Sequence, residues 1–279
     1  MLTSEAVERA AGQIARRLSR APARAALVIA SPGKRSLAQA VVGALRAEGR
    51  RCQMVELSAA NQTETAPLCR LVAEVAGRWA LALLLDAQEA PFLFEVAGRP
   101  DRGLRLPEET LYCDWLAPLE CTVRLMGADL DEVARFRQRL LAALAPAHEL
   151  RVTTPAGTDL SVRPRHWLAA DGEVFTAPQE GLADGHLVID GSLYSGPLPR
   201  PAVLEIVAGR VANADDLDRG DPRLAWLYAD LTRDAGANVV AELGLGIHPA
   251  ARAAADLMEA EQARGTCHFG FGHNLPYGG

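Results

Sequence analysis

The stretch "AALVIASPGKRSLAQAVVGALRAEG", residues 25–49, decides the fold class of the N-terminal part of the chain. It begins with the apolar run Ala25–Ala30, passes through "SPGKRS", and then repeats apolar residues every three to four positions until Gly49. A short apolar run, a turn signal and a helical repeat predict a strand, a loop and a helix that the glycine ends. This is one unit of an alternating α/β arrangement.

The sequence on both sides continues the alternation. Residues 4–18 carry apolar side chains at helical spacing, and Thr3 or Ser4 is available to cap the first amides. Beyond Gly49, "CQMVEL" predicts a strand, "TAPLCRLVAEVAGRW" a helix and "ALALLLDA" a further strand. Strands that alternate with helices of this length predict a mostly parallel sheet covered on both faces.

We therefore expect two domains. The first is an α/β domain over residues 1–147, which the helix "DLDEVARFRQRLLAALA" closes. The second covers residues 148–279, where short β-prone runs such as "ELRVTT", "HLVID" and "AVLEIV" alternate with Gly, Pro and Asp and predict an antiparallel region. Its helices are "DPRLAWLYADLTRDAG", with Asp221 as N-cap and Pro222 at the first helical position, and "HPAARAAADLMEAEQA". The predicted fold class is α/β, followed by a mixed α+β metal-binding domain.

Composition excludes several classes of protein. The net charge of -6 is spread along the chain, which argues against nucleic acid and anionic membranes as partners. Five scattered cysteines contain no CxxC pair and indicate neither a zinc knuckle nor a disulfide framework. The N-terminus lacks the apolar run of a signal peptide, and no apolar stretch reaches the ~18 residues that span a bilayer. We expect a soluble, cytoplasmic protein.

The loop "SPGKRS" follows a strand and opens a helix, which is where anions bind in parallel sheets. It lacks the glycine spacing of a dinucleotide fingerprint or a P-loop. We therefore interpret Lys34 and Arg35 as a solvated helix start.

Two glutamates in the second half are candidates for a functional site. Glu242 is the one charge in the mostly apolar run "VVAELGLGI", and a buried charge needs a partner or a metal. A functional carboxylate and a salt-bridged structural one are both open. Glu173, in "DGEVFTAP", is by itself most simply a surface carboxylate beside a turn.

The final stretch "GTCHFGFGHNLPYGG" adds a histidine and a tyrosine. His268 alternates with Cys267 and Phe269, a pattern typical of a strand, and a lone histidine there is more often a core residue than a ligand. Two carboxylates and an imidazole together, however, suit Zn²⁺, Co²⁺ or Mn²⁺. Tyr277 could donate a hydrogen bond to a developing oxyanion, or it could simply pack.

Five segments, taken in order, resemble the aminopeptidase T family of metal-dependent exopeptidases: "TTPAGTDL", "DGEVFTAP", "GHLVIDGS", "AELGLGIHPAAR" and "GTCHFGFGHNLPYGG". They extend over most of residues 151–279. The resemblance implies an N-terminal α/β domain, a C-terminal domain with two divalent metals, and homodimers that enclose the active site. It places Glu173, Glu242 and His268 at metal-ligand positions and gives Glu242 or a nearby carboxylate the role of proton carrier.

The sequence departs from the family pattern in two ways. Tyr277 follows His268 by a longer interval than the tyrosine of the larger members. Family members also continue to a His-x-Asp element that completes the two-metal site, and the resemblance therefore implies that the second domain is incomplete at its C-terminal end.

The function expected from these observations is a metallo-aminopeptidase-like hydrolase that releases N-terminal residues from peptides or cleaves small amides. Ring-cleaving dioxygenases of dihydroxypyridines resemble this family and use one iron held by two histidines and one aspartate. Such an enzyme would not require both Glu173 and Glu242, and their presence favours hydrolysis. A third hypothesis is a catalytically inactive binding protein.

Overall fold

A computed structural model describes residues 2–20, 22–58, 65–76, 78–90, 92–93, 111–114, 116–194, 196–253 and 257–274. The chain forms two compact units, Met1–Leu130 and Asp131–Gly279. The first is α/β and the second is built on an antiparallel sheet with helices, as the sequence predicts.

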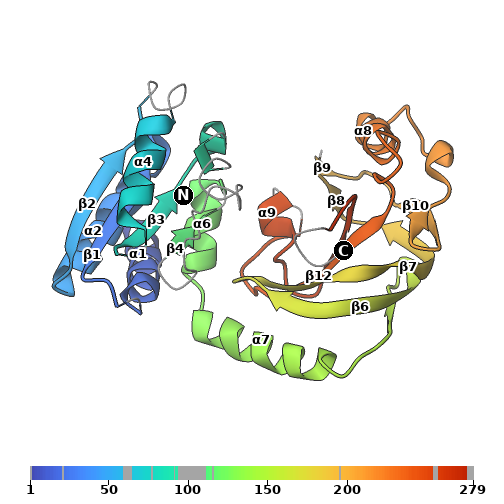
Figure 1. The fold of residues 1–279 in the computed structure, drawn as a ribbon, viewed down its shortest axis with the longest axis horizontal. Helices are drawn as coiled ribbons and strands as arrows, with labels where there is room; N and C mark the ends of the chain where they lie inside the picture. The colour runs from blue at the N-terminus through green and yellow to red at the C-terminus, as the bar shows by residue number, and fades with distance from the viewer. Residues whose placement is uncertain are drawn as a thin grey trace. The chain divides into compact units, whose positions relative to one another are not determined.

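The first unit contains a four-stranded parallel sheet in the order β2-β1-β3-β4 (Figure 1). Its strands are β1 (Ala25–Ala30), β2 (Arg51–Glu56), β3 (Ala80–Leu84) and β4 (Leu111–Cys113). Strands β1 and β3 are buried along their whole length. Continuous burial explains why both strands are unbroken apolar runs in the sequence, because both faces of the sheet are covered.

Helices cover the two faces of this sheet separately. On one face, α1 (Ser4–Ser19), α2 (Arg35–Ala47) and α6 (Leu119–Met126) pack against Ala26, Val28 and Ala30. On the other face, α4 (Ala66–Val75) packs against Leu27 and Ile29. Alternate residues of β1 therefore belong to different cores, as the period of a strand requires. Thr3 caps α1 by accepting a hydrogen bond from the amide of Ala6, at 3.2 Å.

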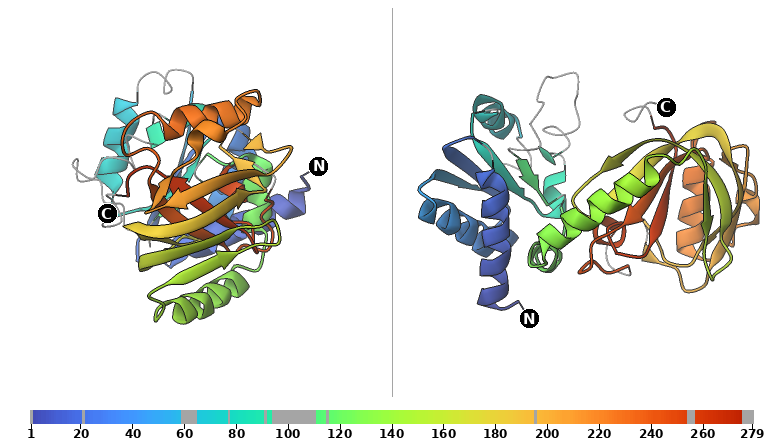
Figure 2. Two further views of the ribbon diagram at one scale, coloured as in Figure 1. Left: turned by 90° about the vertical axis from the view of Figure 1, so that its right-hand side faces the viewer. Right: turned by 90° about the horizontal axis from the view of Figure 1, so that it is seen from below.

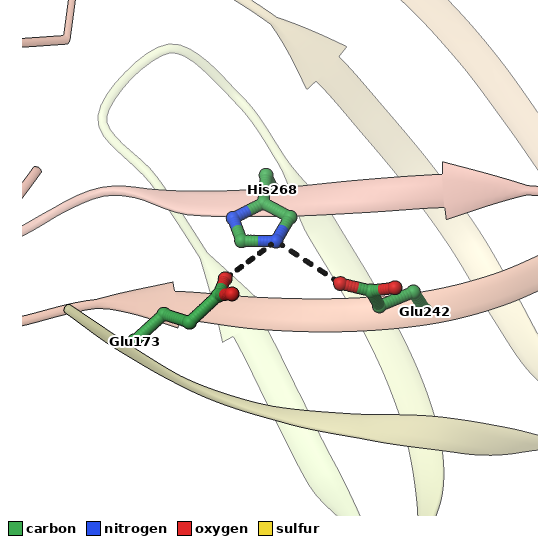
Figure 3. Close-up of side chains that lie close together, drawn as sticks. All are labelled: Glu173, Glu242 and His268. Carbon is green, nitrogen blue, oxygen red and sulfur yellow. Dashed lines mark hydrogen bonds and ion pairs between the residues drawn. The ribbon is translucent and has the colours of Figure 1, made fainter. Parts of the chain in front are cut away.

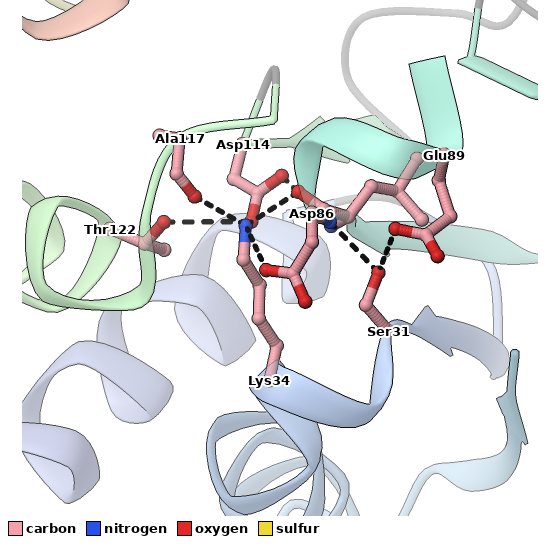
Figure 4. Close-up of polar contacts among 8 residues, drawn as sticks. Ser31, Lys34, Asp86, Glu89, Asp114, Ala117 and Thr122 are labelled. Atoms are coloured by element: carbon pink, nitrogen blue, oxygen red, sulfur yellow. Dashed lines mark hydrogen bonds and ion pairs between the residues drawn. The ribbon is translucent and has the colours of Figure 1, made fainter. Parts of the chain in front are cut away.

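The loop between β1 and α2 corrects one prediction, because Lys34 is not solvated. Its side chain is 0% exposed at the end of the short 3-10 helix η1 (Pro32–Lys34). Nζ donates to the carbonyl of Leu85 at 2.7 Å, to Oδ2 of Asp114 at 2.5 Å and to the carbonyl of Ala117 (Figure 4). The three donors of the ammonium group thus find three acceptors, which makes its burial possible. Arg35 is exposed, as expected, and pairs with Glu56.

The second unit contains a seven-stranded antiparallel sheet. The order along its main path is β11-β10-β7-β12-β13; β6 also pairs with β7, and β5 pairs with β6. Its strands are β5 (Leu150–Thr153), β6 (Asp159–Ala169), β7 (Glu173–Ile189), β10 (Ala202–Val207), β11 (Arg210–Val211), β12 (Val240–Gly246) and β13 (Cys267–Phe271). Two short strands, β8 (Ser192–Leu193) and β9 (Gly196–Pro197), pair apart from it.

Strand β7 joins two segments that the sequence shows as separate. It runs without interruption from Glu173 in "DGEVFTAP" to Ile189 in "HLVID". Gly185 allows this continuity, since it has a φ of +136° and a Cβ there would lie 2.2 Å from the backbone oxygen of Asp159 on β6. The strand is long enough to pair with β12 near its start and with β10 near its end.

Helix α7 (Leu130–Leu144) belongs with the second unit, whereas the sequence attached it to a first domain ending at residue 147. Its residues Val133 and Phe136 pack with Val174 and Ile247 of the sheet domain. In Figure 2 this helix, in green, runs beside the yellow-green strands of the same unit.

The other two helices of the second unit differ in how well they were predicted. Helix α8 (Pro222–Leu231) begins as expected, with Asp221 accepting a hydrogen bond from the amide of Arg223 at 2.8 Å. The helix predicted over residues 248–263 is much shorter, because among its described residues only α9 (Leu257–Ala260) is α-helical. The backbone of His248 instead bridges to the far end of the predicted helix, donating to the carbonyl of Gln262 at 2.8 Å and accepting from the amide of Arg264 at 3.2 Å. No helix within the described ranges is long and apolar enough to cross a membrane.

Candidate metal centre

The structure brings Glu173, Glu242 and His268 together on one face of the second sheet (Figure 3). Nε2 of His268 lies 3.3 Å from Oε1 of Glu242 and 3.4 Å from Oε2 of Glu173. One ligand atom from each residue lies within 4.8 Å of the others. The three side chains come from β7, β12 and β13, and strand pairing therefore fixes their separation.

Glycines opposite the three residues make this convergence possible. Across the strands, Gly246 faces Glu173, Gly244 faces His268, and Gly270 faces Glu242. A Cβ on Gly244 would lie 2.1 Å from both Cε1 and Nε2 of His268, which means that the imidazole ring occupies the space above this glycine. Gly244 and Gly270 therefore leave room for the side chains of His268 and Glu242, whereas a Cβ on Gly246 would meet the backbone oxygen of Ala263 at 2.1 Å.

Burial and charge shift the pKa values in this cluster. Burial raises the pKa of Glu173 to about 7, and the negative charges of Glu261 and Glu242 add to this, while His268 opposes it. For His268, burial alone would lower the pKa. The hydrogen bond with Glu242 and the negative charges of Glu173, Glu261 and Glu242 nevertheless raise it above its ordinary value. The cluster therefore attracts positive charge, either as a proton or as a cation.

The residues fit a divalent cation. The side chains are only partly exposed, at 18% for Glu173, 19% for His268 and 30% for Glu242. Within the described part of the chain, the buried atom Nδ1 of His268 has no hydrogen-bond partner, and Oε2 of Glu173 makes no hydrogen bond beyond its 3.4 Å ion-pair contact with Nε2 of His268. Two carboxylate oxygens and an imidazole nitrogen form a donor set that Zn²⁺, Co²⁺, Mn²⁺ or Fe²⁺ accepts.

Sequence reasoning missed one acidic residue near this cluster. Glu261 lies just after α9, and its charge raises the pKa values of both Glu173 and His268. Burial raises the pKa of Glu261 itself, Glu242 adds to that effect, and His268 opposes it. The segment "DLMEAEQA" lies in the helix predicted from the sequence, and its carboxylates were therefore interpreted as belonging to the exposed side of that helix. The sequence signal that could have revealed it was Gly265, because this glycine ends the helical pattern shortly after Glu261 and just before β13.

Arg264 holds the turn that follows Glu261. Its Nε donates to the carbonyl of Ile247 at 3.0 Å, and its guanidinium group pairs with Glu132 of α7 at 2.9 Å. The guanidinium group also lies over the ring of Phe136, 4.8 Å from its centroid. These contacts fix the segment between Glu261 and His268 against α7.

Tyr277, the remaining site residue predicted from the sequence, lies outside the described residues. The proposed role of its phenol stays a prediction.

Comparison with known proteins gives the fold. No protein-family model matches the chain, and no curated protein matches it in sequence. Two solved structures match it along nearly its whole length. The 2,5-dihydroxypyridine dioxygenase from Pseudomonas putida KT2440 has a TM-score of 0.66 at 16% identity, with 100% of this chain and 89% of that chain covered. The chain shares the fold of this enzyme. Wild-type AmpT from Thermus thermophilus has a TM-score of 0.60 at 15% identity, over 95% of this chain and 85% of that one.

The two similar structures cover both enzyme classes that the sequence suggests. One is the ring-cleaving dioxygenase, and the other is AmpT, which agrees with the resemblance to the aminopeptidase T family. At these identities the likeness establishes the shared fold and leaves the reaction to be inferred from the site.

Proposed function

We propose that the protein is a divalent-metal-dependent hydrolase of the aminopeptidase type, which releases N-terminal residues from peptides or cleaves small amides. The observation that carries this proposal is the convergence of two glutamates on one histidine across three adjacent strands. Two carboxylates in one small site would neutralise a doubly charged cation, and Oε2 of Glu173, which makes no hydrogen bond, is available to bind it.

Glu173, Glu242 and His268 would hold the metal. A bound divalent ion supplies Lewis acidity and a nucleophile derived from water near neutral pH. The chain itself supplies the charge and the geometry: Glu173 and His268 are the more buried ligands, and Glu242 is the more exposed carboxylate. Exposure suits Glu242 to accept a proton at its carboxylate and release it to solvent. Glu261 adds negative charge beside the cluster, which favours cation binding.

The second candidate is an iron-dependent, ring-cleaving dioxygenase. The likeness to the Pseudomonas putida enzyme favours it, with the higher TM-score and coverage of the whole chain. The donor set argues against it, because the described cluster offers two carboxylates and one imidazole. Oxygen consumption with a dihydroxypyridine and iron, with peptides left intact, would establish this candidate instead.

The partners we propose are a small peptide or amide substrate and a second copy of the chain. Neither nucleic acid nor a membrane surface fits the net charge of -6. We also propose a cytoplasmic location, because all five cysteines are free thiols.

The decisive experiment compares Glu242→Gln with the wild type. The protein, supplied with Co²⁺, Zn²⁺ or Mn²⁺, should release N-terminal residues from short peptides, and chelation should abolish this activity. Glu242→Gln keeps the size of the side chain and removes its charge, and turnover should fall by ~10²-fold or more.

Glu205→Gln is the matched control, because Glu205 is exposed on β10. Its activity should equal that of the wild type. A wild-type protein that binds metal but cleaves no peptide would contradict the hydrolase proposal, and unchanged turnover in Glu242→Gln would remove this residue from the mechanism.

A further inference from the structure

We propose that Phe175 is a specificity-determining residue, which selects substrates with an apolar side chain next to the reacting carbonyl. This inference rests on the proposed function, because it assigns the contact made by a ligand held at the metal centre. It concerns a residue that neither the sequence motifs nor the ligand cluster assigned.

The strand register places Phe175 beside the ligand cluster. Gly244 faces His268 on one side and Phe175 on the other, and Leu168 faces Phe175 from β6. These four residues therefore form one cross-strand row over β6, β7, β12 and β13. Residues directly opposite each other on paired antiparallel strands have Cβ atoms roughly 4.5–5.5 Å apart and point to the same face.

Phe175 also shares a face with both glutamates. Glu173 is two residues before Phe175 on β7, and Glu242 is two residues before Gly244 on β12. Because side chains alternate along a strand, each pair lies on the same face of the sheet. The imidazole of His268 lies over Gly244, so its Nε2 is directed across β12 toward the strand that carries Phe175.

The intervening residues belong to the opposite face. Val174 packs in the core under α7, and Leu243 and Phe269 pack in the main core of the second unit. Phe175, by contrast, is partly exposed on the face that carries the glutamates and the histidine. A ligand held at the cluster would therefore lie on the face to which Phe175 belongs, with Phe175 opposite the glycine over which the histidine lies.

This arrangement decides which substrate group is favoured. Behind Phe175 in the same row lies Leu168, and the two side chains offer an apolar surface. A charged group placed against these two side chains would lose hydration, and neither side chain could pair with it. An aliphatic or aromatic group would instead remove its apolar surface from water, which favours binding. One methylene group in such a contact changes selectivity by about 10- to 200-fold.

The test measures ligand binding to the cobalt-loaded protein, which does not depend on turnover. Leucine hydroxamate and glycine hydroxamate carry the same metal-binding group and differ in the side chain. Wild type should bind leucine hydroxamate ~10-fold or more tightly than glycine hydroxamate in calorimetry. Phe175→Ala should bring the two affinities within ~2-fold while leaving cobalt content and the affinity for glycine hydroxamate unchanged.

Phe175→Leu should restore most of the preference, because it retains an apolar side chain. Val207→Ala is the control, since Val207 is 57% exposed on β10, and its preference should match that of the wild type. If Phe175→Ala loses cobalt, Phe175→Gln decides, because it fills similar space with a polar group: a preference that falls by ~3-fold or more supports the role, and an unaltered preference overturns it.

The outcomes separate this inference from the proposed function. If the ligand preference depends on Phe175 but the protein cleaves no peptide, the specificity role of Phe175 is supported and the hydrolase proposal is refuted. Peptide cleavage with an unchanged preference in Phe175→Ala, or an equal loss of affinity for both hydroxamates, overturns the specificity role alone. A wild-type protein that binds no cobalt overturns both.

Discussion

Gly244 shows how strongly the site depends on a residue without a side chain. The ring of His268 occupies the space that a Cβ at this position would take. In Gly244→Ala the ring must move, because it is the end of a side chain and the strand backbone is fixed by pairing on both sides. We expect a folded protein whose metal affinity falls about 10- to 100-fold, the range measured when residues that orient metal ligands are changed.

Equilibrium dialysis with Co²⁺ would measure this effect. Gly43→Ala is the matched control, because a Cβ there meets nothing within 4 Å in helix α2. That change should leave metal affinity intact and raise the free energy of unfolding by about 0.5–1 kcal/mol. Equal metal affinity in Gly244→Ala and wild type would mean that His268 is not held in the observed orientation.

The candidate ligand residues differ in how far the sequence could predict them. Glu242 was recognisable because a charge in an apolar strand needs a partner, and His268 because it alternates with apolar residues near glycines. That Glu173 lies beside them depends on the pairing of β7 with β12, which local sequence does not encode. The resemblance to a family supplied this link. Glu261 was missed because its neighbours have helical periodicity.

At the scale of elements, the buried Lys34 ties three parts of the first unit together. Its ammonium group joins the start of α2 to the segments that follow β3 and β4, through Leu85 and Asp114. Asp114 in turn accepts a hydrogen bond from the amide of Leu85 at 3.1 Å. Burial raises the pKa of Asp114 to about 6, although the neighbouring charge of Lys34 opposes this. Desolvation of the carboxylate thus outweighs the attraction of its partner.

This balance predicts non-additive stability effects. Lys34→Met leaves a buried carboxylate without its partner and should lower the free energy of unfolding by about 3–5 kcal/mol. Adding Asp114→Asn removes the charge, keeps an acceptor for Leu85, and should restore part of the loss. Arg35→Met is the control, because its pair with Glu56 is exposed and should matter by only about 0–1 kcal/mol. Urea denaturation measures the free energy of unfolding of these variants. If the losses from Lys34→Met and Asp114→Asn simply add in the double variant, the two residues are not coupled.

The sequence predicted the regular elements better than the connections between them. The strand, loop and helix of residues 25–49 follow from apolar periodicity, and the structure confirms all three. Lys34 was misread because a lysine at a helix start is normally solvated, and its three acceptors come from residues 51 to 83 positions away. The predicted helix over 248–263 was wrong at its start because the backbone of His248 pairs with Gln262 and Arg264, a contact that apolar spacing does not reveal.

For the whole molecule, the division into an α/β unit and an antiparallel unit was readable from the change in pattern after Pro146. The exact boundary was not. Helix α7 is amphipathic, but its sequence does not say which core its apolar side will meet, and Val133 packs with Val174 and Ile247 far along the chain. The unit to which an amphipathic helix at a domain boundary belongs is decided by the residues against which its apolar side packs.

The last prediction concerns assembly. We expect a homodimer, from the resemblance to the aminopeptidase T family and because Glu242 keeps 30% of its side chain exposed in the single chain. A second copy that covers the cluster would exclude water and strengthen its electrostatic interactions. Light scattering at micromolar concentration should give about twice the chain mass of 29.8 kDa.

Dilution distinguishes a dimer that encloses the site from one that forms elsewhere. If the partner covers the metal centre, peptide turnover per chain should fall at the concentration at which the scattering mass falls, and excess protein should restore it. Turnover that stays constant while the dimer dissociates would mean that a single chain suffices for catalysis. A monomer at micromolar concentration with full activity would refute the dimer and leave the metal centre to function while open to solvent.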